Sequence, residues 1–295
     1  MASAKEIQNR IKSVQDTMKI TNAMFMIASS KLRKAKKEVE VSGPYFSAMR
    51  QTIAAIQDYA PAVQNRYYDK RPEKSGKDRT YGYLVLTADK GLSGSYNHNV
   101  VKLVQKELDK HPGQNALYVA GRLGRHFYRK QGENVMHQFH YVVEDPSLTR
   151  VREVSHRVLE DYNQGKVDEL YMVYTRMNTP MSCETKISKL LPLDEETFQD
   201  IPDGGPREVE LFPTPEEVLD SVIPIYLHGV IFGGLVASFC SEQNSRMLAM
   251  QSATNNAKEM LHDLSIQYNR IRQTAITQEI TEVIAGARAQ RQKQQ

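Results

Sequence analysis

One loop of this 295-residue chain contains the glycine, serine and lysine residues that could bind phosphate or supply a catalytic nucleophile. It reads ADKGLSGSYN over residues 88–97 and lies between an expected strand and an expected helix, as phosphate loops and nucleophile elbows do. The loop lacks the glycines of a dinucleotide fingerprint and the Gly-Lys-Ser/Thr ending of a Walker loop, and an elbow around Ser93 would need glycine in place of Ser95. We therefore interpret it as a tight turn with Asn97 as a candidate helix cap.

The other residue types that perform chemistry are scattered. Of the eight histidines, His137 and His140 are three apart on an expected strand and would point to opposite faces of a sheet, so they are poor ligands for one metal ion. Cys183 and Cys240 have neither metal-site spacing nor the density of a secreted disulfide scaffold, which favours a reducing cytosol. The sequence thus predicts no catalytic residue, no metal site and no cofactor, and hence no enzyme.

A basic cluster near the N-terminus is more informative. Its members are Lys31, Arg33, Lys34, Lys36 and Lys37, with Glu38 and Glu40 as acidic neighbours. A solvated helix face is one interpretation, and a docking patch for an acidic protein segment is the other. Nucleic acid is the weaker partner, because the net charge is only +4, no aromatic residues interleave with the basic ones and no nucleic-acid motif is present.

Two stripes of apolar residues predict the helices that carry the basic cluster and the C-terminal part of the chain. Both repeat in alternating steps of three and four, the period of a coiled-coil seam. The N-terminal stripe is Ile7, Ile11, Val14, Met18, Thr21, Phe25, Ala28, Leu32, Ala35 and Val39, and the C-terminal one is Ala257, Leu261, Leu264, Tyr268, Ile271 and Ala275. Helices at both ends of the chain can therefore pair as one antiparallel rod.

Composition changes divide the chain into six segments. We expect an N-terminal helix over 1–59 with a kink or short break near Ser42, because Gly43 and Pro44 follow it. A charged linker over 60–80, an α/β domain over 81–193 and a second linker over 194–214 come next. The last helix covers 215–289, with Thr214 as its cap, Pro215 at its first position and Glu217 completing a capping box, and residues 290–295 are expected to fray.

The central domain alternates strand-like and helix-like runs. YGYLVLT, ALYVAG and ELYMVYTRM are typical of buried strands, and VVKLVQKEL and VREVSHRVLEDY are typical of amphipathic helices. This order predicts a largely parallel sheet with helices on its faces. Residues 221–241 carry no charged side chain but contain a proline, a histidine and glycines, so we expect a helix packed on protein, with Gly229 and Gly233 allowing another backbone to approach.

Three blocks of the sequence resemble the signature blocks of one family. They are KITNAMFMIASSKLRKA at 19–35, DKGLSGSYN at 89–97, and SEQNSRMLAMQSATNNAKEML followed by YNRIRQTAITQEITEVIAGA between 241 and 287. In this order they are similar to the γ subunits of bacterial F-type ATP synthases. The resemblance implies a long antiparallel coiled coil of the terminal helices with a Rossmann-like α/β domain at its foot.

The resemblance also implies a function and a set of partners. The family's rod is a central rotor shaft that couples ion flow through the membrane c ring to conformational change in the catalytic subunits. Its partners are the catalytic and non-catalytic subunits of the hexamer, the ε subunit and the c ring, with no nucleic acid and no membrane contact except through the complex. The chain would be a non-catalytic, peripheral subunit at the cytoplasmic face of the bacterial cell membrane.

The resemblance further implies which residues contact the catalytic subunits. Met24, Lys31, Arg33 and Lys34 match positions where the shaft meets an acidic loop of the catalytic subunit, and Arg246 falls in the same coupling zone. Arg272 and Gln273 match a pair that engages a catch loop, with Thr277 and Glu279 nearby. The sequence departs from the family's usual pattern at Ser93, at Cys240 and in the polar ending RQKQQ.

Two other functions remain open on sequence alone. A non-rotating coiled-coil scaffold or adaptor would have the same rod but would tolerate substitutions on its surface. A nucleotide-dependent enzyme would use the central domain, and the purified chain would then bind nucleotide by itself.

Overall fold

The computed structural model describes residues 4–60, 63, 65–74, 78–112, 114–140, 143–198 and 211–292. The chain forms two compact units: a paired-helix unit of residues 1–27 with 247–295, and an α/β unit of residues 28–246. Helices α1 (Ala4–Tyr59) and α5 (Pro215–Gln292) each contribute to both units. The predicted division instead assigned each helix to one segment.

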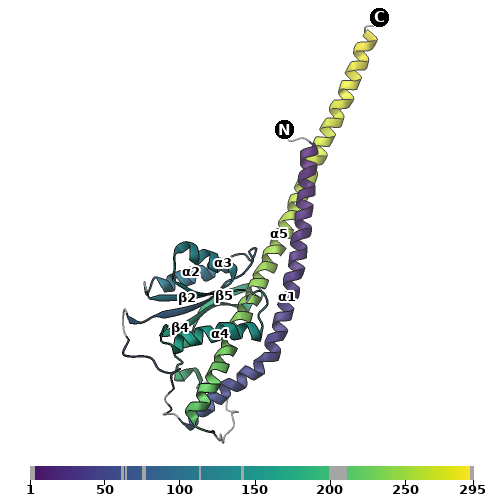
Figure 1. The fold of residues 1–295 in the computed structure, drawn as a ribbon. Helices are drawn as coiled ribbons and strands as arrows, with labels where there is room; N and C mark the ends of the chain where they lie inside the picture. Colours follow the sequence, from purple (N-terminus) through teal and green to yellow (C-terminus); the bar gives the residue numbers. More distant parts are fainter. Residues whose placement is uncertain are drawn as a thin grey trace. The chain divides into compact units, whose positions relative to one another are not determined.

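The paired-helix unit is an antiparallel coiled coil, as Figure 1 shows. Ile7 and Thr21 of α1 are buried, as are Thr254, Ala257 and Leu264 of α5, whereas the residues between the stripe positions are exposed except for the half-buried Met24. The hydroxyl groups of Thr21 and Thr254 share a buried hydrogen bond of 2.8 Å across the seam. The predicted pairing of the two ends of the chain is therefore confirmed.

The seam on α5 ends earlier than its sequence stripe. Ile271 is still half-buried, but Ala275 is exposed, so its predicted place in the seam is wrong. Figure 1 shows α5 continuing past the first described turn of α1, so this part of α5 has no second helix of the described chain to pack on. The helix runs to Gln292, beyond the predicted end at 289 and into the segment expected to fray, and residues 293–295 lie outside the described part.

A five-stranded sheet organises the α/β unit, in the order β3-β2-β1-β4-β5. Strands β1 (Tyr81–Leu86), β2 (Asn115–Ala120), β3 (Val135–Phe139) and β4 (Glu169–Thr179) are parallel, and β5 (Ser182–Leu191) pairs with β4 in the antiparallel sense. The predicted largely parallel sheet is therefore confirmed. The sequence interpretation missed β5 and helix α3 (Arg122–Gln131), whose sequence is dominated by charged and polar residues.

The two faces of the sheet carry separate cores, because side chains along a strand alternate between faces. Tyr83 and Val85 of β1 point toward α2 (Tyr96–Leu108) and α3. Leu84 and Leu86 point to the other face, where α4 (Leu148–Asn163) and the first half of α5 pack with the second half of α1. The second half of α1 is thereby part of the α/β unit's core.

The uncharged stretch 221–241 lies in this second core. Helix α5 is the one described helix long and apolar enough to cross a membrane, with a mean hydropathy of 1.8 in its most apolar window, of which 56% is buried inside the structure. Its buried side chains recur at helical spacing: Ile223, Leu227, Ile231, Leu235 and Phe239. The stretch is a helix packed on protein, as predicted.

The glycines of that stretch act differently from the prediction. At Gly229 a methyl group in place of the hydrogen would lie 2.1 Å from Cδ1 of Phe46, so α5 accepts the ring of an α1 side chain there. A methyl group added at Gly233 would have no atom within 4 Å, so no neighbouring segment approaches the helix closely there. The close approach occurs at Gly234 instead, where the Met172 side chain packs against the helix. The predicted spaced pair of glycines is wrong at Gly233.

Helix α1 passes through Gly43 and Pro44 without a break. The hydroxyl of Ser42 donates to the carbonyl of Glu38 at 2.8 Å, and the ribbon of α1 bends in its second half in Figure 1. A proline removes one backbone hydrogen bond but leaves the rest of the ladder, and the packing of this half of α1 in the core compensates for that loss. The predicted break is therefore wrong, whereas a bend remains.

Part of the first predicted linker is fixed by a buried carboxylate. Asp168 accepts hydrogen bonds from Arg71 Nη1 at 2.8 Å, Lys74 Nζ at 2.7 Å and the Thr80 N–H at 2.9 Å. Burial alone would raise the pKa of Asp168, but the bonds from Lys74, Thr80 and Arg71 hold it below its usual value. The described residues of this segment contain turns but no α-helix or strand before Tyr81, and they are anchored to the start of β4.

The second predicted linker leads into a capped helix. A short 3-10 helix, η2 (Glu195–Phe198), is followed by residues 199–210, which lie outside the described part of the chain. The Glu217 N–H donates to Thr214 Oγ1 at 3.3 Å, and α5 begins at Pro215. The predicted cap and start of the last helix are confirmed.

Candidate partner-binding surfaces

The loop at 88–97 is a structural turn. Leu92 and Gly94 have positive φ angles of 63° and 57°, and Ser93 is buried. Asn97 accepts a hydrogen bond from the Ala88 N–H at 2.9 Å and donates to Ser93 Oγ at 3.3 Å, so it closes the loop. The N-cap of α2 is the residue before Tyr96 and makes no side-chain capping bond, so the prediction that Asn97 caps the helix is wrong.

Arg246 holds this loop against α5. Its Nη2 donates to the carbonyl oxygens of Lys90 and Gly91, both at 3.1 Å, and it forms an ion pair with Glu242 one turn earlier. Burial raises the pKa of Glu242, and the positive charges of Arg246 and Lys31 oppose that rise. Arg246 and Lys31 therefore both act on one buried carboxyl group.

The basic cluster of α1 is mostly exposed to solvent. Arg33 and Lys34 are exposed and Lys31 is half-buried. Lys34 Nζ lies 3.4 Å from Asp145 Oδ1 and 4.0 Å from Glu38 Oε1. Surface pairs of this kind contribute only about 0–1 kcal/mol each, so these cations can exchange their acidic neighbours for those of a partner at little cost.

The remaining predicted contact residues lie in the paired-helix unit. Met24 is half-buried on α1. On α5, beyond the seam, the exposed residues include Arg272, Gln273, Thr277 and Glu279. The Thr277 hydroxyl donates to the carbonyl of Gln273 at 2.8 Å, so that hydroxyl is satisfied within its own helix. The structure thus groups these four residues on one short stretch of a single helix.

The same stretch carries an apolar surface that the sequence interpretation did not single out. Ile276, Ile280, Val283 and Ile284 are between 47% and 71% exposed. Their spacing of four, seven and eight residues is that of one helix face, and this periodicity could have revealed it. An exposed apolar face of this kind is typical of a surface that another protein covers.

The histidines form no metal site within the described chain. His137 lies on β3 and His140 follows the strand, where its ring contacts the Arg125 guanidinium. Among the described residues, no group of three or more His, Cys, Asp or Glu side chains could hold a metal ion.

Comparisons with known proteins agree with an assembly of two long pairing helices and an α/β domain. The family described as ATP synthase matches residues 3–290. The chain is 41% identical to the ATP synthase gamma chain of Ruminiclostridium cellulolyticum, over 97% of this chain and 98% of that one. It is 42% identical to the gamma chain of Acetivibrio thermocellus, over 98% and 99% of the two chains.

A solved structure shares the fold at much lower identity. A chain from the rotor of the mitochondrial ATP synthase of Euglena gracilis aligns with a TM-score of 0.64 and 15% identity, over 92% of this chain and 98% of that chain. Together with the match over nearly the full length, this shows that the chain belongs to the ATP synthase gamma family and is a non-catalytic subunit of that membrane-associated complex.

Proposed function

We propose that this chain is the rotor shaft of a bacterial ATP synthase, in which its orientation sets the conformations of the surrounding catalytic subunits. The observation that carries the proposal is the antiparallel pairing of the two ends of the chain, closed by the buried bond between Thr21 and Thr254. Conformational coupling requires contacts that differ between states of the partner. The paired-helix unit, with its polar and apolar surfaces, and the basic cluster further along α1 would provide such contacts.

The proposed contacts with the catalytic subunits fall in two groups. Lys31, Arg33 and Lys34 present positive charge to an acidic loop, and exposed charges of this kind steer association and register more than they add affinity. Arg272 and Gln273 would engage a second loop, with Thr277 and Glu279 beside them and Met24 adding a flexible apolar contact. Arg246 would act by positioning the loop around Lys90 and Gly91, which it already holds.

The further partners follow from the family. The ε subunit and the membrane c ring would bind the α/β unit, and the non-catalytic subunits of the hexamer would surround the helices together with the catalytic ones. The complex would place this chain at the cytoplasmic face of the cell membrane as a peripheral subunit, with coupling to ion transport through the ring. Relatives named as ATP synthase gamma chains support this proposal.

A double substitution tests the rotor function against a passive scaffold. Arg272→Ala with Gln273→Ala should reduce coupled ATP synthesis in the assembled complex while leaving subunit composition unchanged, because both side chains are exposed and lie outside the seam. The matched control is Arg270→Ala with Gln267→Ala, which removes the same side-chain types from exposed positions beside the seam. Normal synthesis by the first variant in a normally assembled complex would favour the scaffold.

A further inference from the structure

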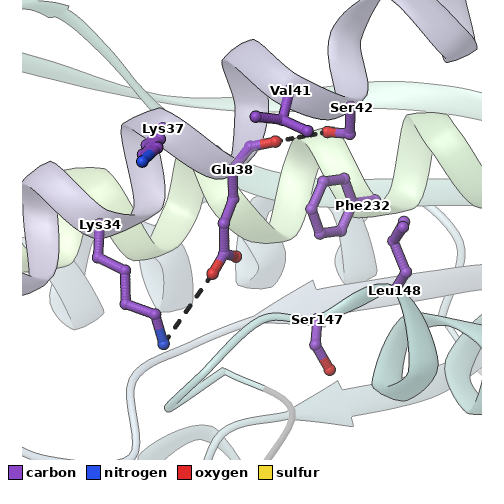
Figure 2. Close-up of a pocket in the computed structure, with 8 residues that line it drawn as sticks. All are labelled: Lys34, Lys37, Glu38, Val41, Ser42, Ser147, Leu148 and Phe232. Atoms are coloured by element: carbon purple, nitrogen blue, oxygen red, sulfur yellow. Dashed lines mark hydrogen bonds and ion pairs between the residues drawn. The ribbon is translucent and has the colours of Figure 1, made fainter.

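The α/β unit contains a cavity that the proposed function does not use. It lies between α1, the start of α4 and α5, and has a volume of about 470 Å³. Figure 2 shows the ring of Phe232 between Val41 of α1 and Leu148 of α4. We call this cavity the α1–α4 pocket, and its lining residues are Lys34, Lys37, Glu38, Val41, Ser42, Ser147, Leu148 and Phe232.

The floor and walls of the α1–α4 pocket are apolar. Phe232 is almost fully buried, so its ring forms a recessed floor, whereas Val41 is 74% and Leu148 51% exposed. Ser42 donates its hydroxyl hydrogen to the Glu38 carbonyl, and Ser147 Oγ accepts from the Arg150 N–H, so Ser147 is the one hydroxyl of the lining with a hydrogen left to donate. A ligand in this space therefore meets hydrocarbon over most of its length. The volume lies within the range of about 300–1,000 Å³ that is usual for small-molecule sites.

The rim of the α1–α4 pocket carries one lysine without an acidic partner among the described residues. Two lysines and one glutamate line it. Lys34 lies near Glu38 and Asp145, as Figure 2 shows for Glu38. Lys37 forms no hydrogen bond or ion pair with any residue that the structure describes. Helix α4 also begins at this rim, and its first N–H groups favour negative charge.

We propose that the α1–α4 pocket binds a free medium-chain fatty acid, with the carboxylate at Lys37 and the alkyl chain over Val41, Leu148 and Phe232. A single carboxylate matches the one lysine of the rim that has no acidic partner among the described residues. A phosphate ester or nucleotide would place several charges and hydrogen-bonding groups against apolar walls that cannot satisfy them. An alkyl chain binds more tightly with each methylene group that it buries against these walls.

Calorimetric titration of the full-length chain with decanoate, below its micelle concentration, tests this proposal. We expect saturable binding of one decanoate per chain, weaker binding of decanol and no binding of decyltrimethylammonium. Lys37→Glu should weaken decanoate binding at least tenfold, because it replaces the attracting charge with a repelling one. Lys36→Glu is the matched control: it makes the same charge change on the neighbouring exposed residue, which does not line the pocket, and should change affinity less than twofold.

A second variant separates the apolar contact from the charge. Leu148→Asn, which removes the apolar side chain without adding a charge, should abolish binding while the thermal unfolding midpoint stays near that of the wild type, because this side chain is half exposed. Equal binding of decanoate and decyltrimethylammonium would overturn the proposal, since it would indicate unspecific partitioning. Equal losses in the two lysine variants, or no decanoate binding by the wild type, would overturn it as well.

Discussion

Replacing Gly229 by alanine tests how α1 and α5 pack in the α/β unit. The added methyl carbon would lie 2.1 Å from Cδ1 and 2.4 Å from Cγ of Phe46, well inside the distance at which carbon atoms can meet. Cγ does not move when the ring turns about the Cβ–Cγ bond, so a ring flip does not clear the clash. The ring also packs near Tyr45 and Phe232, with centroid distances of 5.3 and 6.1 Å, which leaves it little room to shift.

The expected magnitude combines two opposing effects. Alanine in place of glycine in a helix interior stabilises by about 1 kcal/mol. Overpacking a filled core costs about 1–3 kcal/mol. Gly229→Ala should therefore lower the free energy of unfolding by about 0–2 kcal/mol. At Gly233 nothing lies within 4 Å, so Gly233→Ala should keep the whole gain of about 1 kcal/mol.

Urea denaturation of the two variants and the wild type measures this difference. We expect Gly233→Ala to be more stable than Gly229→Ala by about 1–3 kcal/mol. Phe46→Ala combined with Gly229→Ala should cost less than the sum of the two single changes, because the clash disappears with the ring. A Gly229→Ala variant as stable as Gly233→Ala would refute the packing of Phe46 on α5.

Three further substitutions or reactions test other contacts. Asp168→Asn should lower the free energy of unfolding by about 3–5 kcal/mol at neutral pH, since Arg71 and Lys74 lose their buried partner. Because the folded state depresses the pKa of Asp168, this contribution is complete above the ordinary aspartate pKa of about 3.9 and fades at lower pH, so the variant and the wild type should converge there in denaturation curves. Thr21→Val alone should destabilise the paired-helix unit by about 1 kcal/mol by removing the partner of the buried Thr254 hydroxyl, and adding Thr254→Val should restore most of this loss, as thermal unfolding by circular dichroism would show. Iodoacetamide at pH 8 should leave Cys240 unmodified in the folded chain, because burial raises the pKa of its thiol to about 11, and rapid alkylation in a mass spectrum would contradict this.

The sequence predicts well the elements that depend on a repeating apolar pattern or on a local interaction. The stripes that begin at Ile7 and Ala257 predicted the helix pair. Apolar residues in alternating steps of three and four form one face of a helix, and that face is buried when it packs against a similar one. Thr214, Pro215 and Glu217 fixed the start of α5 within a residue, because a cap is a local interaction.

Contacts between distant segments could not be predicted in the same way. The role of Gly229 depends on Phe46, which lies far away in the sequence, and a spacing rule cannot tell it from Gly233. Arg246 looked like a free contact residue, yet it holds the carbonyl groups of Lys90 and Gly91. Gly43 and Pro44 predicted a kink or a short break near Ser42, because their local cost is evident in the sequence, whereas the compensating packing of Phe46 and its neighbours is not.

Single-molecule observation of the assembled complex tests the central claim most directly. A probe on Lys106→Cys, an exposed residue of α2, reports the orientation of this chain while the catalytic subunits are fixed to a surface and supplied with ATP. The rotor function predicts repeated rotation in one direction, at a rate that follows ATP hydrolysis. A probe that keeps one orientation while the complex hydrolyses ATP would contradict it.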